Sequence, residues 1–213
     1  MIDPSGVTEY STLSLPFGAT WDTRAVKKDA TDGVAISAEV KPFYGLGYTD
    51  SGVRLVWDAR GYKTASQSGA LVFAARVQAG AILGSSLAGT PREDLFYSGG
   101  PATVRGQPYK SLGVYQLTDG SGTPFLTGGT HFLAGSLESR LKVGRNLGLV
   151  GFVDIGHVDA NAQFSLADNW QAGAGIGLRY LTTIGPIRLD VASPISGTTG
   201  DGLQLYVGLG QSF

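Results

Sequence analysis

Hydrophobic and polar residues alternate along most of this 213-residue chain. Successive side chains of a β-strand point to opposite faces of a sheet, so a period of two predicts strands with one apolar face and one polar face. The end of the chain illustrates the pattern. There, one face carries Leu203, Leu205, Val207, Leu209, Gln211 and Phe213, and the other carries Gln204, Tyr206, Gly208, Gly210 and Ser212.

The same alternation recurs about nine times along the chain. It predicts strands near residues 13–21, 34–40, 53–59, 71–77, 133–141, 149–155, 172–180, 187–191 and 203–213. Nearly all the charged residues in these strands lie on the face opposite the aliphatic residues. They are Glu39, Arg54, Asp58, Arg60, Arg76, Glu138, Arg140, Asp154, Arg179, Arg188 and Asp190.

A charge on the lipid face of a membrane barrel costs about 2–4 kcal/mol at mid-membrane, so this segregation is what a lipid-facing wall requires. It predicts an antiparallel transmembrane β-barrel with its apolar face toward lipid and its ionic residues in a wet lumen. A soluble β-sandwich would show the same alternation with the aliphatic faces packed inward. The pattern alone leaves that alternative open.

Composition narrows the protein class. Charged residues make up 15% of the chain, against about 25% in ordinary soluble domains. The net charge of −1 provides no basic field for nucleic acid. The absence of cysteine excludes disulfides and thiolate metal sites. No apolar run is long enough for a transmembrane helix. An all-β protein, either a barrel or a sandwich, remains.

The predicted connections differ in length. Short turns fall at 144–146 and 183–185, and longer ones at 27–33, 159–169 and 196–202. Outer-membrane barrels have short periplasmic turns and long external loops. The longest connection, about residues 84–130, is too long for an idle connector, and we expect it to be functional or folded into the lumen.

An odd number of antiparallel strands cannot close on itself, and bacterial barrels normally have an even number. We therefore expect residues 1–213 to form the C-terminal part of one outer-membrane barrel domain, with further N-terminal strands in the parent protein. Residues 1–6 lack the basic and apolar regions of a signal peptide, which agrees with a piece of a longer chain.

An ordered series of motifs lies in the second half of the chain. Residues 96–106 read FYSGGPATVRG, followed by GSLESR at 135–140, GFVDIG at 151–156 and GPIRLD at 185–190. This series resembles the C-terminal barrel of the bacterial outer-membrane insertases, the BamA and TamA superfamily, whose barrel is also called the bacterial surface antigen domain. The resemblance implies a parent barrel of about 16 strands. GPIRLD and the final GLGQSF make the TamA branch the most similar.

The resemblance implies that Val104, Arg105 and Gly106 belong to the sixth extracellular loop, which folds back into the lumen. It implies that Arg105 meets Glu138 and Asp154, with Phe152 beside them. The alternation independently assigns these three partners to the lumen face, and a guanidinium offers carboxylates a rigid fork of donors. The alternative is a loop tip with Arg105 in solvent. The family usually has an aromatic where this chain has Gln107, so the resemblance does not predict how Gln107 packs.

The terminal strand resembles the signal by which such barrels are recognised, with Tyr206 on the lumen face and Phe213 as the aromatic end. Gly208 and Gly210 are expected to weaken pairing at the seam between the first and last strands. The resemblance implies insertion or secretion of β-barrel or autotransporter clients in the Gram-negative outer membrane, by strand addition at that seam. It implies outer-membrane lipid, client proteins and an inner-membrane-anchored, periplasm-spanning protein as partners.

Enzymatic chemistry finds little support. His131 and His157 are predicted at strand ends without further soft ligands, so no metal, cofactor or catalytic site is expected. A serine site using His157 and Asp154 has no supporting spacing. Gly173, Gly175 and Gly177 lie within a strand and predict a smooth lumen wall beside the folded-in loop. Alternative functions are a passive pore, a two-partner secretion channel, or the anchor of a fused patatin-like enzyme.

Overall fold

The computed structural model describes residues 9–117, 124–161, 170–200 and 202–213, and within these ranges the regular structure is all β. No helix in these ranges is long and apolar enough to cross a membrane. The strands are β1 (Ser11–Ser14), β2 (Phe17–Asp22), β3 (Gly33–Leu46), β4 (Gly52–Thr64), β5 (Leu71–Leu83), β6 (Val114–Leu117), β7 (Pro124–Thr127), β8 (His131–Val143), β9 (Leu147–Asp159), β10 (Gln171–Tyr180), β11 (Ile187–Ser196) and β12 (Gln204–Leu209).

One antiparallel sheet runs in the order β1-β3-β4-β5-β8-β9-β10-β11-β12, with β2 also paired to β3. β1 and β2 occupy successive parts of the same edge, because Ser11 pairs with Leu46 while Phe17 pairs with Val40. The break between them falls at Pro16, which has no N–H to donate to a ladder. The sheet therefore has nine positions, as the alternation predicts. The β6–β7 hairpin within the long connection is not predicted from the sequence.

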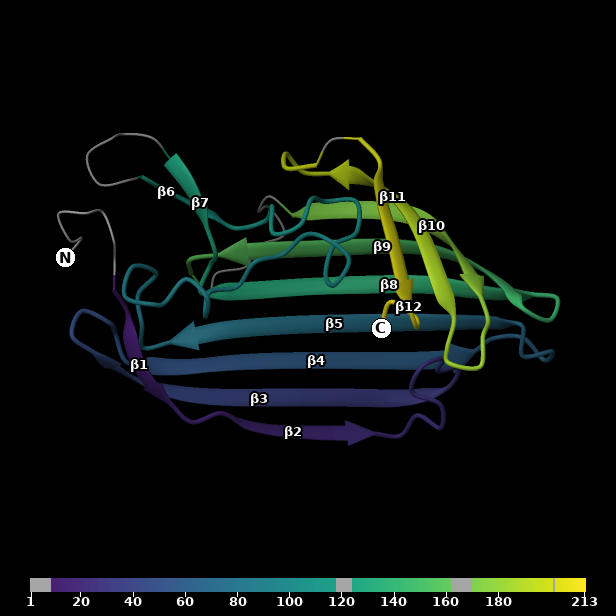
Figure 1. Ribbon diagram of the computed structural model, residues 1–213, viewed down its shortest axis with the longest axis horizontal. Coiled ribbons are helices and arrows are strands. Elements are labelled where there is room, and N and C mark those ends of the chain that lie inside the picture. Colours follow the sequence, from purple (N-terminus) through teal and green to yellow (C-terminus); the bar gives the residue numbers. More distant parts are fainter. Residues whose placement is uncertain (1–8, 118–123, 162–169, 201) are drawn as a thin grey trace.

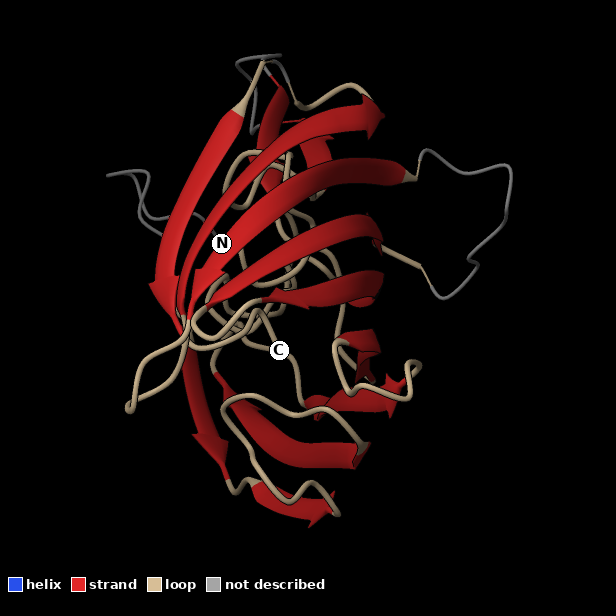
Figure 2. Cartoon of the chain, turned by 90° about the vertical axis from the view of Figure 1, so that its right-hand side faces the viewer, coloured by secondary structure: helices blue, strands red, loops and turns tan. Residues whose placement is uncertain are grey.

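The sheet curls into part of a barrel (Figures 1 and 2). In Figure 1, β11 and β12 pass in front of the long central strands, and in Figure 2 the strands arch around the loop segments. Among the described residues, β12 and the β1–β2 edge are the two ends of the sheet and do not pair with each other. The loop segments occupy the concave side of this arch.

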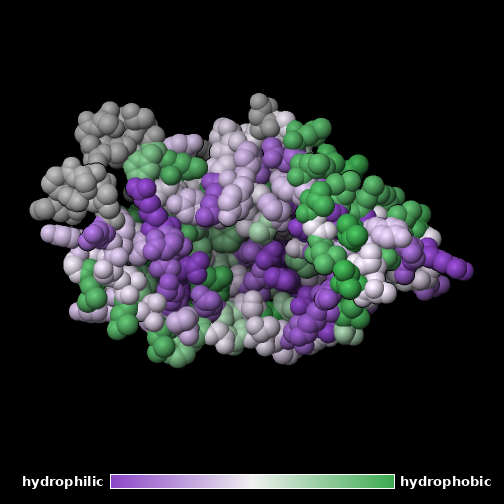
Figure 3. Space-filling view, viewed as in Figure 1, coloured by the Kyte–Doolittle hydropathy of each residue, from purple (hydrophilic) through white to green (hydrophobic). Residues whose placement is uncertain are grey.

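The alternation separates an outer apolar face from an inner ionic one. Large apolar side chains are exposed along the outer face, for example Leu137, Ile176 and Val207. The buried ionic residues of β8 to β11 are Glu138, Arg140, Asp154, Arg179 and Asp190. In Figure 3, hydrophobic residues cover the region of β10–β12, and hydrophilic residues gather in the hollow beside it. A sandwich would bury the aliphatic residues, so the sandwich alternative is wrong.

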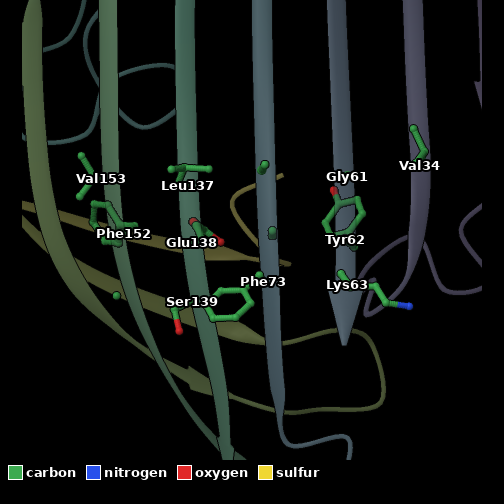
Figure 4. Close-up of a pocket in the computed structure, with 13 residues that line it drawn as sticks. Val34, Gly61, Tyr62, Lys63, Phe73, Leu137, Glu138, Ser139, Phe152 and Val153 are labelled. Carbon is green, nitrogen blue, oxygen red and sulfur yellow. The ribbon is translucent and has the colours of Figure 1, made fainter. Parts of the chain in front are cut away.

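A shallow hollow of about 690 Å³ opens over β3, β4, β5, β8 and β9 (Figure 4). Its outward side chains Val34, Phe73, Leu137 and Val153 are exposed. Gly61 and Gly151 contribute no side chain to its lining, so the surface dips there. An apolar depression on this face suits acyl chains better than water.

Two expectations from the sequence are wrong. The connection at 23–32 is long, yet it joins β2 to β3 at the same end of the sheet as the short turn at 144–146, so connection length does not alternate strictly between the two ends. The outward assignment of Gln211 and Phe213 also fails. The chain turns at Gly210, whose φ is +91°, and Phe213 is buried on the concave side. Alternation applies only while the strand lasts, and β12 ends at Leu209.

The lipid-facing assignment makes a depth-dependent prediction for β9. Val153 and Leu147 both point outward, but Val153 lies in mid-strand and Leu147 begins the strand. In the full-length barrel, Val153→Lys should lower the free energy of unfolding in lipid vesicles by about 2–4 kcal/mol, and Leu147→Lys by about 0–1 kcal/mol. Denaturant titration of both variants measures this difference. Equal small losses would mean that the face contacts water.

Candidate functional site: an arginine locked in the lumen

A closed loop positions the candidate site. Ser98 and Leu112 exchange backbone hydrogen bonds of 3.1 and 3.0 Å, which bring the ends of the loop together. Within it, the Gly100 N–H donates to the carbonyls of Val104 and Gln107, at 3.0 Å each. Gly106 has a φ of +95°, which an L side chain rarely adopts. The segment Val104–Gln107, called the loop tip below, is thus held as a compact turn.

An apolar cluster holds the loop against the inner wall. Its buried members come from the loop and from β3, β5, β8 and β9. They are Phe43, Ile82, Leu95, Phe96, Val104, Leu112, Phe132, Ala134 and Val158. Phe96 stacks on Phe132 at 6.0 Å between ring centroids, and the guanidinium of Arg54 lies 4.5 Å from the Phe96 ring. The loop therefore enters the lumen as a packed element.

Arg105 lies at the centre of the site and is 1% exposed. Its Nε and Nη2 donate to the two carboxylate oxygens of Asp154 at 2.7 and 3.0 Å, and its backbone N–H donates to the same carboxylate at 3.0 Å. Its Nη1 lies 2.6 Å from Glu138 Oε1. The guanidinium carbon is 3.5 Å from the centroid of the Phe152 ring. The solvent-exposed alternative for Arg105 does not fit this burial.

The guanidinium of Arg105 stays protonated despite its burial. Burial alone would lower the pKa of the guanidinium, but the hydrogen bonds to Asp154 and the charges of Asp154 and Glu138 outweigh it and raise the pKa of Arg105 above its usual value. Arg105 is therefore a permanent cation. A buried cation of this kind requires nearby carboxylates, which the inner wall supplies.

The ionic network extends beyond the residues that the sequence singled out. Asp190 lies 3.5 Å from Arg105 and also pairs with Arg179. Arg140 pairs with Glu138 at 2.7 Å. The alternation assigns these residues to the lumen face, but which residues they pair with depends on how β8 to β11 curve around the loop. The sequence does not predict Asp190, Arg140 or Arg179 as members of the site.

Gln107 stands where the family resemblance leads one to expect an aromatic residue, and it packs by hydrogen bonds. It is fully buried, and its side-chain amide donates to the carbonyls of Ala172 and Ser196, at 3.0 Å each. Its Oε1 accepts a hydrogen bond from the Thr199 hydroxyl at 2.9 Å. Gln107 therefore fastens the loop tip to β10 and β11 by hydrogen bonds in place of an aromatic contact.

The glycines of β10 leave room for the network, as the sequence predicted for a smooth wall. A Cβ at Gly173 would collide with the Arg105 carbonyl oxygen. At Gly175 it would collide with the Val191 carbonyl and the Phe152 ring, and at Gly177 with the Asp190 carboxylate. Only Gly173 makes room for the loop itself; the other two accommodate residues of the wall.

Of the predicted seam residues, Tyr206 and Gly208 lie on the concave side of β12, while Gly210 and Phe213 follow the end of the strand. Tyr206 is half-buried, and its hydroxyl oxygen accepts a hydrogen bond from the Gly106 N–H at 3.0 Å. Gly208 pairs with Arg188, whose side chain covers it. Phe213 lies with Ala30, Tyr62 and Ala74. Nothing in this geometry tests whether Gly208 and Gly210 weaken the seam, which stays a prediction.

Neither histidine belongs to the group formed by Arg105 and its carboxylate partners Glu138, Asp154 and Asp190, which we call the lock. His131 lies 3.0 Å from the Thr130 hydroxyl, while His157 lies 3.6 Å from Asp159 and its ring is tilted against the Trp170 ring, with 5.3 Å between the centroids. Asp154 is engaged by Arg105, so it does not orient His157 for catalysis. In the described ranges, no group of three histidine, aspartate or glutamate residues could hold a metal ion.

Removing the central cation should destabilise the barrel. Arg105→Ala would leave Asp154 buried without the guanidinium that pairs with it and Glu138 paired with Arg140 alone, and breaking a buried pair costs about 3–5 kcal/mol. Arg92→Ala is the matched control, because Arg92 is an exposed arginine of the same loop whose guanidinium lies 5.0 Å from the centroid of the Phe125 ring, and the loss of such an exposed contact should cost no more than about 1 kcal/mol. Heat-modifiability on gels and denaturant midpoints measure both. Equal, mild effects would argue against the lock.

A second prediction tests the close approach at Gly173. Gly173→Val should displace the loop tip and reduce the fraction of heat-modifiable protein, because its side chain would occupy the position of the Arg105 carbonyl. Gly151→Val is the control, since a Cβ there meets nothing within 4 Å. Equal protease resistance of the loop in the two variants would contradict this account.

Comparison with known proteins agrees with this architecture. The model of the Omp85 superfamily domain matches residues 3–213. A crystal structure of BamA from Haemophilus ducreyi lacking POTRA domains 1–3 is similar in fold, with a TM-score of 0.75 and 21% sequence identity. The match covers 91% of this chain, which spans 41% of that BamA chain. With a family match over almost its whole length, the chain belongs to the Omp85 superfamily.

Proposed function

We propose that this chain is the barrel part of a TamA-like assembly factor of the Gram-negative outer membrane, which inserts or secretes β-barrel or autotransporter clients. Membership of the Omp85 superfamily supports a general role in outer-membrane protein insertion or translocation. The observation that carries the proposal is the buried Arg105, held by carboxylates of β8, β9 and β11. The GPIRLD and GLGQSF motifs favour the TamA branch.

The proposed activity needs no covalent chemistry. The outer edge of β12 has no strand partner in the described part of the chain, so its backbone N–H and C=O groups form a template for another strand. A client strand that adds there gains main-chain hydrogen bonds, while its apolar face meets lipid. We therefore assign the chain a non-enzymatic role that uses no cofactor or metal.

The proposed partners follow from the two faces of the sheet. The outer face, with exposed Leu205, Val207 and Leu209 on β12, suits outer-membrane lipid. Client outer-membrane proteins would add at the edge of β12. An inner-membrane-anchored protein that spans the periplasm completes the proposal for a TamA-like protein, and would contact the full-length protein at its periplasmic side.

The packed loop weighs against a passive pore. Loop residues Leu95, Phe96 and Val104 belong to the interior cluster, so the loop fills space that an open pore would need. A two-partner secretion channel would have to displace this cluster for each substrate. The third alternative, the anchor of a fused patatin-like enzyme, requires a patatin-like domain before the barrel in the full-length protein. The sequence upstream of the barrel therefore tests it. Conductance in planar bilayers separates an open pore from a loop-filled barrel, because a loop-filled barrel should show no steady large conductance.

Client insertion in liposomes tests the proposal. The full-length protein should accelerate the folding of a urea-unfolded outer-membrane protein over empty liposomes, as measured by heat-modifiability over time. Arg105→Ala should reduce the rate toward that of empty liposomes because the loop loses its anchor, while Arg92→Ala should keep the wild-type rate. A client that folds equally fast in empty and loaded liposomes would contradict an assembly function.

A further inference from the structure

The terminal strand is held weakly by backbone pairing. β12 and β11 pair through six residue pairs, Ile187–Leu209 to Ala192–Gln204, whereas β8 and β9 pair through thirteen. In the described part of the chain the other edge of β12 has no neighbour. Contacts from inside the barrel therefore make up a large share of what holds β12 in place.

The first interior contact joins β12 to the loop tip. The Gly106 N–H donates to the Tyr206 hydroxyl at 3.0 Å, and the Tyr206 hydroxyl in turn lies 3.5 Å from the Gln107 carbonyl oxygen. Tyr206 pairs across the sheet with Asp190, which is itself an ion partner of Arg105. The tyrosine therefore stands directly beside the lock and links β12 to it.

The second interior contact holds the residues after β12. Gln211 accepts a hydrogen bond from Arg179 Nε and donates one to Asp29, at 2.9 Å each. The Phe213 carbonyl oxygen accepts a hydrogen bond from Arg140 Nη2 at 3.2 Å, and the Arg140 guanidinium lies 5.3 Å from the Phe213 ring. The segment that follows β12 is thus bonded to the inner faces of β8 and β10.

Both interior contacts are connected to carboxylates that also pair with Arg105. Glu138 lies between Arg105, at 2.6 Å, and Arg140, at 2.7 Å. Asp190 lies between Arg105 and Arg179, which holds Gln211. A displacement of the loop tip therefore alters the pairing of the arginines that hold the end of the chain. The reverse also follows, because a coupling free energy between two sites is reciprocal.

We propose that Tyr206 and Arg140 are positioning residues that couple the loop tip to the terminal strand, so that the lock sets how readily β12 opens to an added strand. Tyr206 holds the strand itself and Arg140 holds the segment after it. The consequence for clients rests on the proposed function. The coupling of loop tip and strand rests on the contacts alone.

Hydrogen–deuterium exchange of the full-length protein in vesicles tests the coupling. Tyr206→Phe removes only the hydroxyl, and we expect faster exchange in both β12 and the loop tip, by about two- to tenfold, the usual effect of one lost hydrogen bond. Tyr180→Phe is the control, because Tyr180 points outward from β10 and is 51% exposed. It should leave both segments unchanged.

Arg140→Lys gives a second, independent readout. A lysine keeps the positive charge beside Glu138 but lacks the fork that joins Glu138 and Phe213 together. We expect exchange to rise at residues 211–213 and also at the loop tip. A rise confined to the mutated segment, in both Tyr206→Phe and Arg140→Lys, or no rise at all, would overturn the coupling.

Client folding assays on the same proteins distinguish the two proposals. If wild-type protein accelerates client folding and Tyr206→Phe changes that rate at least about twofold while Tyr180→Phe does not, the lock sets strand opening. An unchanged folding rate together with faster exchange overturns the proposal that the lock sets how readily β12 opens. Failure of the wild-type protein to accelerate any client overturns the proposed function, and the exchange result still decides the coupling.

Discussion

The burial of one guanidinium constrains the rest of this structure. Arg105 is almost entirely shielded from water, and such a cation is tolerated only where carboxylates replace its hydration. Asp154 supplies a bidentate partner, Glu138 approaches Nη1, and Asp190 lies within reach. These acids come from three strands, so the charge cannot be satisfied until the strands curve around the loop. Loop and wall therefore specify each other.

The lipid-facing assignment explains why the acids lie inside. Charges are costly on a surface that meets acyl chains, so each strand has to direct its ionic residues to the concave side. There the acids and arginines lie close together and pair, as Glu138 does with Arg140 and Asp190 with Arg179. The loop adds one more cation, Arg105, to a wall that already contains paired charges. Two interactions therefore hold the inserted loop: the ion pairs of Arg105 with the wall, and the apolar cluster that contains Phe96 and Val104.

Periodicity in the sequence was enough to predict the nine positions of the main sheet, the faces of its strands and the location of Glu138, Phe152 and Asp154 on the concave side, but not the β6–β7 hairpin. The pairing of Arg105 with two of them came from the resemblance to a family, because no local rule relates a loop residue to strands that follow it by more than thirty positions. The contacts of Asp190 and Tyr206 with the loop tip, and those of Gln107 with β10 and β11, depend on the curvature of the sheet and were not predicted. Phe213 was assigned to the wrong face because alternation was extended past Gly210, where a positive φ ends the strand.

The end of the chain shows how these constraints meet at the sheet edge. A strand at the edge has to pair well enough to stay folded, yet an edge that accepts another strand has to remain accessible. Short pairing with β11 combined with side-chain contacts from inside satisfies both needs. Tyr206 and Gln211 hold the strand through bonds on the lumen side, which leave the outer edge and the lipid face of β12 uncovered. Holding the strand from within thus keeps it in place without occupying the hydrogen-bonding groups that a partner strand would use.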